Sequence, residues 1–151
     1  MLARRELSEA QLRERLARRE HPPDAIEAAV ERLRASGLLD DRRVARSAAR
    51  TEAQVRSRGR SRVMQRLHAL GIPPEVAAEA ADEVFETVDE EALLEAALAR
   101  RLHGPAARIR DAAHFRRLHQ QLVRQGFAPS AVTRALRARG WADREGGEED
   151  A

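Results

Sequence analysis

A pair of apolar residues four positions apart recurs three times along this chain and restricts its fold. The pairs are Leu12 and Leu16, Val63 and Leu67, and Leu118 and Leu122, and each precedes a helix stop, a proline and a helix anchored by Ile26, Val76 or Val132. From Leu16 to Leu67 is 51 residues and from Leu67 to Leu122 is 55, a period that suits three helices per repeat. We therefore expect an all-α fold of three tandem three-helix repeats. Because such repeats contact mainly their neighbours, the body should be elongated and curved.

The limits of the repeats follow from the positions of the helix stops. We expect repeats over residues 1–37, 38–86 and 87–140, and an acidic, flexible tail over residues 141–151. The tail has five acids against Arg144 and follows a stop at Gly140, a composition typical of a frayed chain end. No alternating apolar pattern typical of a strand interrupts the helical segments.

Short polar residues mark where several helices should begin. The predicted caps are Ser8 with Gln11 as a capping box, Asp40, Ser61, Thr87 with Glu90 as a second box, and Asp111. The side-chain oxygens of such residues accept hydrogen bonds from backbone amides that have no partner inside the helix.

The helix that begins at about Asp40 is expected to run to about Arg58, because Gly59 is the first strong stop after it. At about 100° per residue, one side carries residues predicted to be buried, which are Val44, Ala48, Thr51 and Val55. The other side carries Arg42, Arg43, Arg46 and Arg50. The prediction is a helix with one buried face and one cationic face.

Charges are segregated along the chain although the net charge is only +3. All 28 basic residues are arginine. Residues 42–66 carry nine arginines against Glu52, residues 72–95 carry nine acids and no arginine, and residues 96–140 carry ten arginines against Asp111. Blocks of one sign create local potentials that steer a charged partner.

Two groups of arginines are the candidate partner-binding residues. They are Arg42, Arg43, Arg46 and Arg50 on the cationic face, and Arg58, Arg60, Arg62 and Arg66 around the next helix start, where free backbone amides add to the positive potential. Three interpretations remain open: a solvated face with arginine stems over apolar surface, contact with nucleic-acid phosphates, or docking on an acidic protein surface. Nucleic-acid contact would rest on phosphate neutralisation, since the chain lacks interleaved aromatic residues for base stacking.

Residue patterns for catalysis or metal binding are missing from the sequence. The chain has no cysteine, no HExxH arrangement among its five histidines and no glycine-rich phosphate loop. The acids Glu75, Glu79, Asp82 and Glu86 recur on one helical stripe, which fits a solvated face better than a cation site. We expect no enzyme activity, no cofactor and no metal. With no apolar run of roughly 20 residues and no signal-peptide core, we expect a soluble, cytoplasmic protein.

An ordered set of residues resembles the RecX family of regulatory proteins. The set is GLLDD at 37–41, a basic helix rich in small residues, and then Arg58, Gly59, Arg62, Val63, Leu67, Gly71 and Ile72. The resemblance extends from about Leu2 to Leu136, nearly the whole chain. Residues 2–8 resemble the second half of the family's first helix, so that helix is expected to be truncated here.

The resemblance implies a partner and a function. RecX proteins modulate the RecA recombinase, so this chain is expected to be a monomer that lies in the groove of the RecA filament on single-stranded DNA. It would inhibit the ATPase, recombinase and coprotease activities of RecA, and so affect DNA repair, recombination and the SOS response. Two other functions stay open, which are an autonomous basic DNA-binding protein and a helical scaffold for a different partner.

Overall fold

The computed structural model describes residues 5–103 and 108–140, and every regular element in these two ranges is a helix. The elements are α1 (Glu9–Arg18), α2 (Pro23–Ala35), α3 (Asp41–Arg50), η1 (Thr51–Val55), α4 (Arg60–Ala69), α5 (Pro74–Thr87), α6 (Glu90–Arg101), α7 (Ala112–Arg124) and α8 (Pro129–Ala138). The predicted all-α fold is confirmed, whereas the predicted acidic tail lies outside the described residues. None of these helices is long and apolar enough to cross a membrane.

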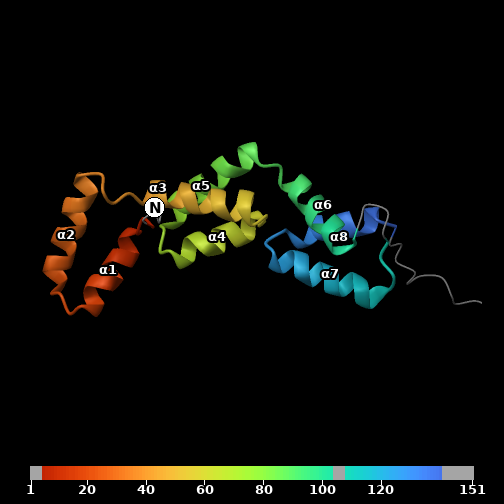
Figure 1. Ribbon diagram of the computed structural model, residues 1–151, viewed down its shortest axis with the longest axis horizontal. Helices are drawn as coiled ribbons and strands as arrows, with labels where there is room; N and C mark the ends of the chain where they lie inside the picture. The colour runs from red at the N-terminus through yellow and green to blue at the C-terminus, as the bar shows by residue number, and fades with distance from the viewer. Residues whose placement is uncertain (1–4, 104–107, 141–151) are drawn as a thin grey trace, which may run out of the picture.

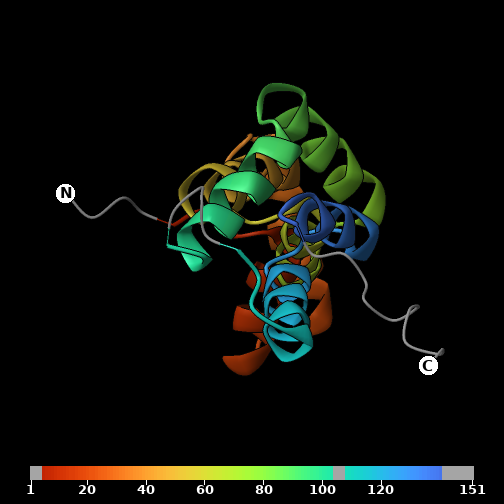
Figure 2. The ribbon, with the colours of Figure 1, turned by 90° about the vertical axis from the view of Figure 1, so that its right-hand side faces the viewer.

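The helices follow one another along an elongated, arched body, as the repeat pattern predicts. Figure 1 shows α1 and α2 at one end, α3 to α5 in the middle and α6 to α8 at the other end. Viewed from the α6–α8 end, the three groups lie one behind another (Figure 2). In the first group, residues 5–8 of the expected half-helix are not helical, and residues 2–4 lie outside the described part.

Each group of helices has its own apolar core. The first core contains Ile26, Val30 and Leu39, with Leu12, Leu16 and Leu33 against them. The second joins α3, α4 and α5 around Val63 and Leu67, and the third joins α6, α7 and α8 around Leu98 and Leu122. Three separate cores fit a division into three repeats. The limits 1–37, 38–86 and 87–140 stay a prediction, since Leu39 belongs to the first core and Val88 packs against the second.

Most of the predicted helix caps are confirmed. Ser8 and Gln11 form the capping box of α1, Asp40 accepts from the amides of the first turn of α3, and Asp111 caps α7. Each of these side chains lies directly before its helix, so the signal is local and readable in the sequence.

Two predicted caps are wrong. Helix α4 begins at Arg60 after Gly59, so Ser61 lies inside its first turn. Asp89 caps α6 by accepting from the amide of Ala92, because it is the residue directly before the helix. Thr87 instead donates to the carbonyl oxygen of Val84 in the preceding helix.

The long helix predicted from Asp40 to Arg58 is wrong in its last part. The α-helical hydrogen bonds end at Arg50, a π-helical turn follows over Thr51–Val55, and Ser57 adopts a left-handed φ of 54°. The buried stripe of α3 runs through Ala45 and Ala49 and continues four residues on at Ala53, which is buried, while Thr51 is exposed and Val55 is 77% exposed.

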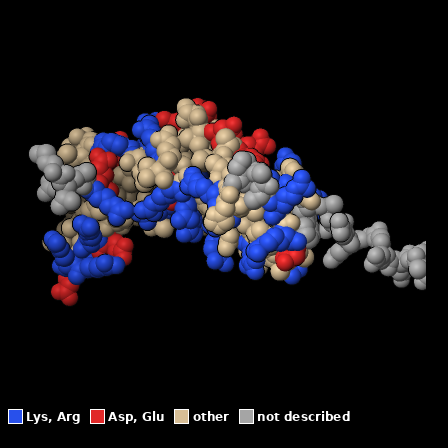
Figure 3. Space-filling model, turned by 45° about the vertical axis from the view of Figure 1, so that its right-hand side comes forward, with Lys and Arg blue, Asp and Glu red and all other residues tan. Residues whose placement is uncertain are grey.

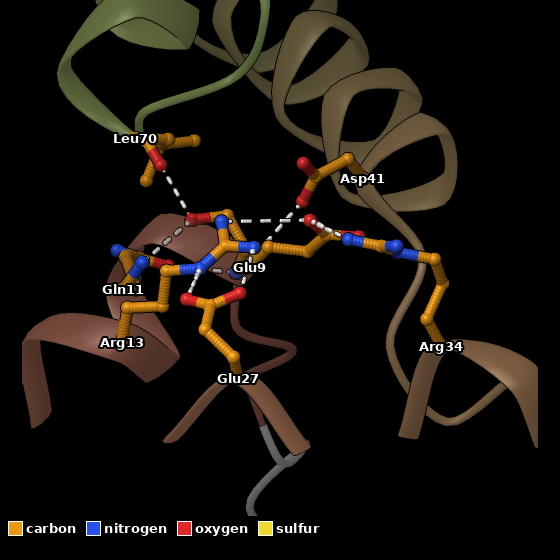
Figure 4. A network of polar contacts seen from close by, with 8 residues as sticks. Glu9, Gln11, Arg13, Glu27, Arg34, Asp41 and Leu70 are labelled. Atoms are coloured by element: carbon orange, nitrogen blue, oxygen red, sulfur yellow. Dashed lines mark hydrogen bonds and ion pairs between the residues drawn. The ribbon is translucent and has the colours of Figure 1, made fainter. Parts of the chain in front are cut away.

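Polar contacts join the first core to the second. The buried Ser8 hydroxyl donates to the carbonyl oxygen of Leu70, at the end of α4, and Figure 4 shows Leu70 beside Glu9, Arg34 and Asp41 at this junction. The backbone amide of Glu9 donates to Asp41 Oδ1 at 2.9 Å, at the start of α3. The Glu9 carboxylate accepts from Arg34 Nε at 2.6 Å, so α1, α2 and α3 meet at one residue.

The two acids at this junction have opposite pKa shifts. The hydrogen bond from Arg34 lowers the pKa of Glu9 below its ordinary 4.5, and burial raises the pKa of Asp41 above its ordinary 3.8. The contribution of Glu9 to stability is therefore complete above pH 4.5 and is lost as the pH falls through its folded pKa. The contribution of Asp41 has the opposite sign, because protonation relieves its burial.

We expect Glu9→Gln to lower the melting temperature at pH 7 and to flatten its decline in acid. The substitution removes the charge that Arg34 stabilises but keeps an acceptor of similar shape. Melting curves followed by circular dichroism between pH 7 and 3 measure the effect. The control is Glu14→Gln, which removes an exposed pair with Arg18, and an equal flattening in the control would contradict the assignment to Glu9.

Candidate arginine interface

The arginines of α3 are neutralised by the protein itself. Arg42 Nη1 lies 2.9 Å from Glu79 Oε2, Arg46 Nε lies 2.9 Å from Glu83 Oε2, and Arg50 Nη2 lies 3.9 Å from Glu83 Oε1. These carboxylates belong to α5, so the basic block of α3 faces the acidic block of α5 across the second core. The predicted cationic face is exposed, but it does not present free positive charge.

Arg43 pairs with a different element. Its Nε lies 2.7 Å from Glu6 Oε1, and its Nη1 lies 3.7 Å from Asp40 Oδ2. Exposed pairs of this kind contribute only about 0.2–1 kcal/mol each. An acidic partner surface can therefore replace these carboxylates at a small cost in free energy. Each ion pair that it forms with these arginines would contribute an equally small free energy of binding.

The four arginines predicted around the start of α4 divide into two kinds. Arg60 has an acidic partner in the protein, with its Nη2 2.6 Å from Asp82 Oδ1, and its backbone amide lies 3.0 Å from Glu90 Oε1. Arg62 is exposed, and its guanidinium group donates to the neutral Gln65 Oε1, at 3.2 Å. Arg58 and Arg66 have no carboxylate within ion-pair distance among residues 5–103 and 108–140. Arg58, Arg62 and Arg66 are thus the predicted residues that keep free positive charge.

The acidic stripe of α5 is explained by these pairs. Glu79 and Asp82, two of the acids considered as cation ligands, lie against Arg42 and Arg60. Over the part of the chain that the structure describes, no three acidic or histidine side chains are placed to hold a metal ion. In Figure 3 several acidic side chains lie along the upper edge of the visible face and a few others lie toward its two ends, while arginines are spread over its lower part.

Arg58 belongs to a groove that the sequence did not reveal. The groove has a volume of about 490 Å³ and is lined by Arg56, Arg58, Ala97, Arg100, Arg101, Gln121, Arg124 and Gln125. We call it the arginine groove. It lies between the end of η1 and the helices α6 and α7, and no Asp or Glu is among its described lining residues. Five guanidinium groups from two repeats therefore share one hollow.

The positions of Arg56 and Arg58 depend on the unusual backbone before α4. Glu52 is only 5% exposed and accepts from Arg56 Nη1 at 3.1 Å, which ties that arginine to the π-turn. Between the two arginines, Ser57 has its left-handed backbone, and its carbonyl oxygen accepts from Gln125 Nε2 at 2.8 Å. Both π-turns and left-handed non-glycine residues cost energy, and they occur frequently at functional sites.

Neutral amides hold the groove on the side of the third core. Arg101 donates from Nη1 to Gln121 Oε1 at 3.1 Å and from Nη2 to Gln125 Oε1 at 3.0 Å. These contacts orient the guanidinium group without cancelling its charge. Arg100 and Arg124 have no described ion pair.

A second groove contains Arg66. It has a volume of about 520 Å³ between the first and second cores, and its lining includes Arg5, Glu6, Val44, Ala48, Glu52, Arg56 and Arg66. Its mixed apolar, acidic and basic lining lacks the uniform charge of the arginine groove. The eight predicted arginines therefore do not form one continuous site.

Comparison with known proteins identifies the family. Residues 1–33 match the family model of the first three-helix domain of RecX, and residues 40–80 match that of the second. Regulatory protein RecX of Halorhodospira halophila is 34% identical over 138 residues, which cover 91% of this chain and 83% of that protein. The chain belongs to the RecX family. Regulatory protein RecX of Chromohalobacter salexigens is 35% identical, over 93% of this chain and 88% of the relative.

Solved RecX structures share the fold. The crystal structure of RecX from Lactobacillus salivarius superposes with a TM-score of 0.75 at 17% identity, over 92% of this chain and 89% of that one. A second RecX crystal structure gives a TM-score of 0.73 at 23% identity, over 91% of this chain and 66% of the other. The predicted membership of the RecX family is therefore confirmed by both sequence and fold.

Proposed function

We propose that this RecX protein is a non-enzymatic regulator that binds the RecA filament on single-stranded DNA and inhibits its ATPase, recombinase and coprotease activities. The protein would act as a cytoplasmic monomer. By inhibiting RecA it would affect DNA repair and recombination. The observation that carries the proposal is family membership, joined to an elongated body in which Arg58 and Arg62, two of the arginines with free charge, lie near the junction of the second and third cores.

The elongated shape suits a partner made of repeating subunits. A body of successive repeats can contact more than one subunit along a filament groove, and linked contacts raise the overall affinity without any strong single site. Bound in this way, the protein would oppose filament growth or favour disassembly. We assign the electrostatic contacts to Arg58, Arg62 and Arg66 rather than to the α3 arginines, because the α3 arginines already have carboxylate partners.

A second candidate is autonomous binding to DNA. The arginine groove favours it, since cations without nearby carboxylates can neutralise backbone phosphates. Both candidates predict weaker binding at higher salt, so salt dependence does not separate them. A variant whose effect is measured with RecA and whose DNA binding is measured without RecA separates the two candidates.

We expect the double substitution Arg58→Glu and Arg62→Glu to weaken inhibition of the RecA ATPase on single-stranded DNA. Each exposed contact contributes at most about 1 kcal/mol, so the concentration for half inhibition should rise by up to about thirtyfold. Helicity by circular dichroism should stay unchanged, because neither side chain belongs to a core.

The control has the same change in net charge at two exposed arginines in the middle of α7 and α8, Arg116→Glu with Arg134→Glu. Equal loss in the control would show that only net charge matters, and full inhibition by the test variant would remove this junction from the binding face. Anisotropy of labelled single-stranded DNA without RecA assigns the cause. Parallel loss of DNA affinity favours the DNA-binding candidate, and unchanged DNA affinity favours docking on RecA.

A further inference from the structure

The arginine groove has the dimensions of a small-ligand site. Its volume of about 490 Å³ lies within the range of roughly 300–1,000 Å³ that is usual for such pockets. Docking along a filament requires exposed charges on an extended surface, but it does not require five guanidinium groups around one hollow. The convergence of these groups is therefore a separate feature that needs its own explanation.

The charge balance of the groove calls for an anion. Of its five arginines, Arg56 has a carboxylate partner, Glu52, which lies outside the lining. Arg58, Arg100 and Arg124 have no ion pair with any described residue, and Arg101 is bonded to amides. Like charges held close together repel one another, and a bound anion with several negative charges would relieve that repulsion.

The groove is also built before any ligand arrives. Glu52 fixes Arg56, the glutamines of α7 fix Arg101, and Gln125 holds the strained Ser57 by its carbonyl oxygen. Side chains that are already ordered lose little freedom on binding, so more of the interaction energy appears as affinity. Guanidinium groups bind phosphate oxygens through paired hydrogen bonds, which distinguishes them from a point charge.

We propose that the arginine groove binds a compact oligophosphate, of the kind found as the phosphate chain of a nucleoside triphosphate or as free tripolyphosphate. An oligophosphate concentrates several charges in a volume that one hollow can hold. A single strand of nucleic acid distributes them along a track and gains from aromatic stacking, and no aromatic residue is among the described lining residues. Acidic peptides also spread their carboxylates along a backbone. The inference does not depend on the regulator proposal.

Isothermal titration calorimetry of the full chain, at low salt and without divalent cations, tests this inference. We expect one molecule of tripolyphosphate to bind per chain, at least about tenfold more tightly than orthophosphate. ATP is titrated in parallel. Equal affinities for ATP and tripolyphosphate would assign recognition to the phosphate chain. Tighter binding of ATP would show an added contribution from the nucleoside. Both results support the proposal.

The variant Arg58→Gln with Arg124→Gln should lose about tenfold or more of the tripolyphosphate affinity, because it removes one free charge from each side of the groove. Arg100→Gln with Arg124→Gln should do the same while leaving the backbone before α4 untouched. Arg116→Gln with Arg134→Gln is the control and should bind as the parent does. Melting temperatures in the absence of ligand check that each variant is folded.

Three results would overturn the proposal. The first is no saturable binding of tripolyphosphate, and the second is equal loss of affinity in the control variant. The third is binding of a thymidine oligonucleotide or a glutamate peptide that depends on Arg58 and Arg124 and that tripolyphosphate does not displace. That third result would make the groove a macromolecular contact.

Discussion

Replacing Gly126 by alanine is expected to destabilise the protein by about 2–5 kcal/mol. Gly126 has a φ of 110°, a conformation that costs a residue with a side chain considerable strain. A Cβ atom there would lie 2.4 Å from the Cβ atom of Arg62 and 2.7 Å from its backbone nitrogen. The strain and the collision add, so the effect should exceed that of an ordinary surface change.

The backbone around Gly126 has little room to relax. The amide of Ser61 donates to the carbonyl oxygen of Gly126 at 3.1 Å, and the amide of Gly59 donates to that of Gln125 at 3.1 Å. These two bonds join the start of α4 to the end of α7 and set the second core against the third. Moving Gly126 away from Arg62 would break them, and the arginine groove beside them would lose its shape.

Urea unfolding followed by circular dichroism measures this loss, and Gly37→Ala provides the matched control. Gly37 also has a positive φ, 76°, but a Cβ atom there would have no heavy atom within 4 Å. Gly37→Ala should therefore lower the free energy of unfolding by only about 1–2 kcal/mol, through backbone strain. Equal losses in the two variants would contradict the close backbone contact between α4 and α7.

Features that depend on neighbouring residues could be predicted from the sequence. Ser8, Asp40 and Asp111 cap their helices as expected, because a cap needs only a short polar side chain directly before the first turn. The apolar pairs predicted the three cores for the same reason, since residues four apart share a helix face.

Features that depend on how helices face one another could not be predicted in the same way. The α5 acids Glu79 and Glu83 pair with Arg42 and Arg46 of α3, each across 37 residues of chain. The opposite signs of residues 42–66 and 72–95 are a usable signal for that pairing. The same charge blocks also fit attraction of a charged partner, so the sequence alone does not separate the two. Glu79 and Glu83 thus neutralise Arg42, Arg46 and Arg50, and Glu6 neutralises Arg43.

The arginine groove had no sequence signal of its own. Arg58, Arg100 and Arg124 are distributed over three segments, and only the contact between the second and third cores brings them together. The π-turn at Thr51–Val55 also lacks a recognisable motif, because its five residues have no property that excludes an ordinary α-helical turn. Gly59 is predicted as a helix stop, and its close approach to Gly126 adds a second role that a stop alone does not imply.

Leu67→Ala should reduce the free energy of unfolding by about 3–5 kcal/mol. The Leu67 side chain is fully buried in the core formed by α3, α4 and α5. Truncation to alanine removes apolar contacts and leaves a cavity that closely packed alanines such as Ala45, Ala49 and Ala81 are too small to fill. Urea unfolding should show a lower midpoint with little change in helicity before the transition.

Because Leu67 lies in the middle core, Leu67→Ala should affect more helices than the lost free energy of unfolding alone implies. When the middle core opens, Ser8 loses the carbonyl oxygen of Leu70, and Gly59 and Ser61 lose their backbone bonds to the end of α7. Hydrogen exchange in Leu67→Ala should therefore accelerate in all three groups of helices. Leu122→Ala provides the comparison, since Leu122 is equally buried but belongs to the terminal core of α6, α7 and α8.

In Leu122→Ala, exchange should accelerate mainly in α6 to α8, because the helices of the second core lie between the first core and the third (Figure 1). Equal acceleration in α1 and α2 for both variants would mean that the chain unfolds as one cooperative unit. Confined acceleration in Leu122→Ala means that the third repeat can open while the other two stay folded. A partner that holds the second and third repeats together would then suppress exchange in α6 to α8 more than in α1 and α2, which links the stability of the junction to its use as a binding site.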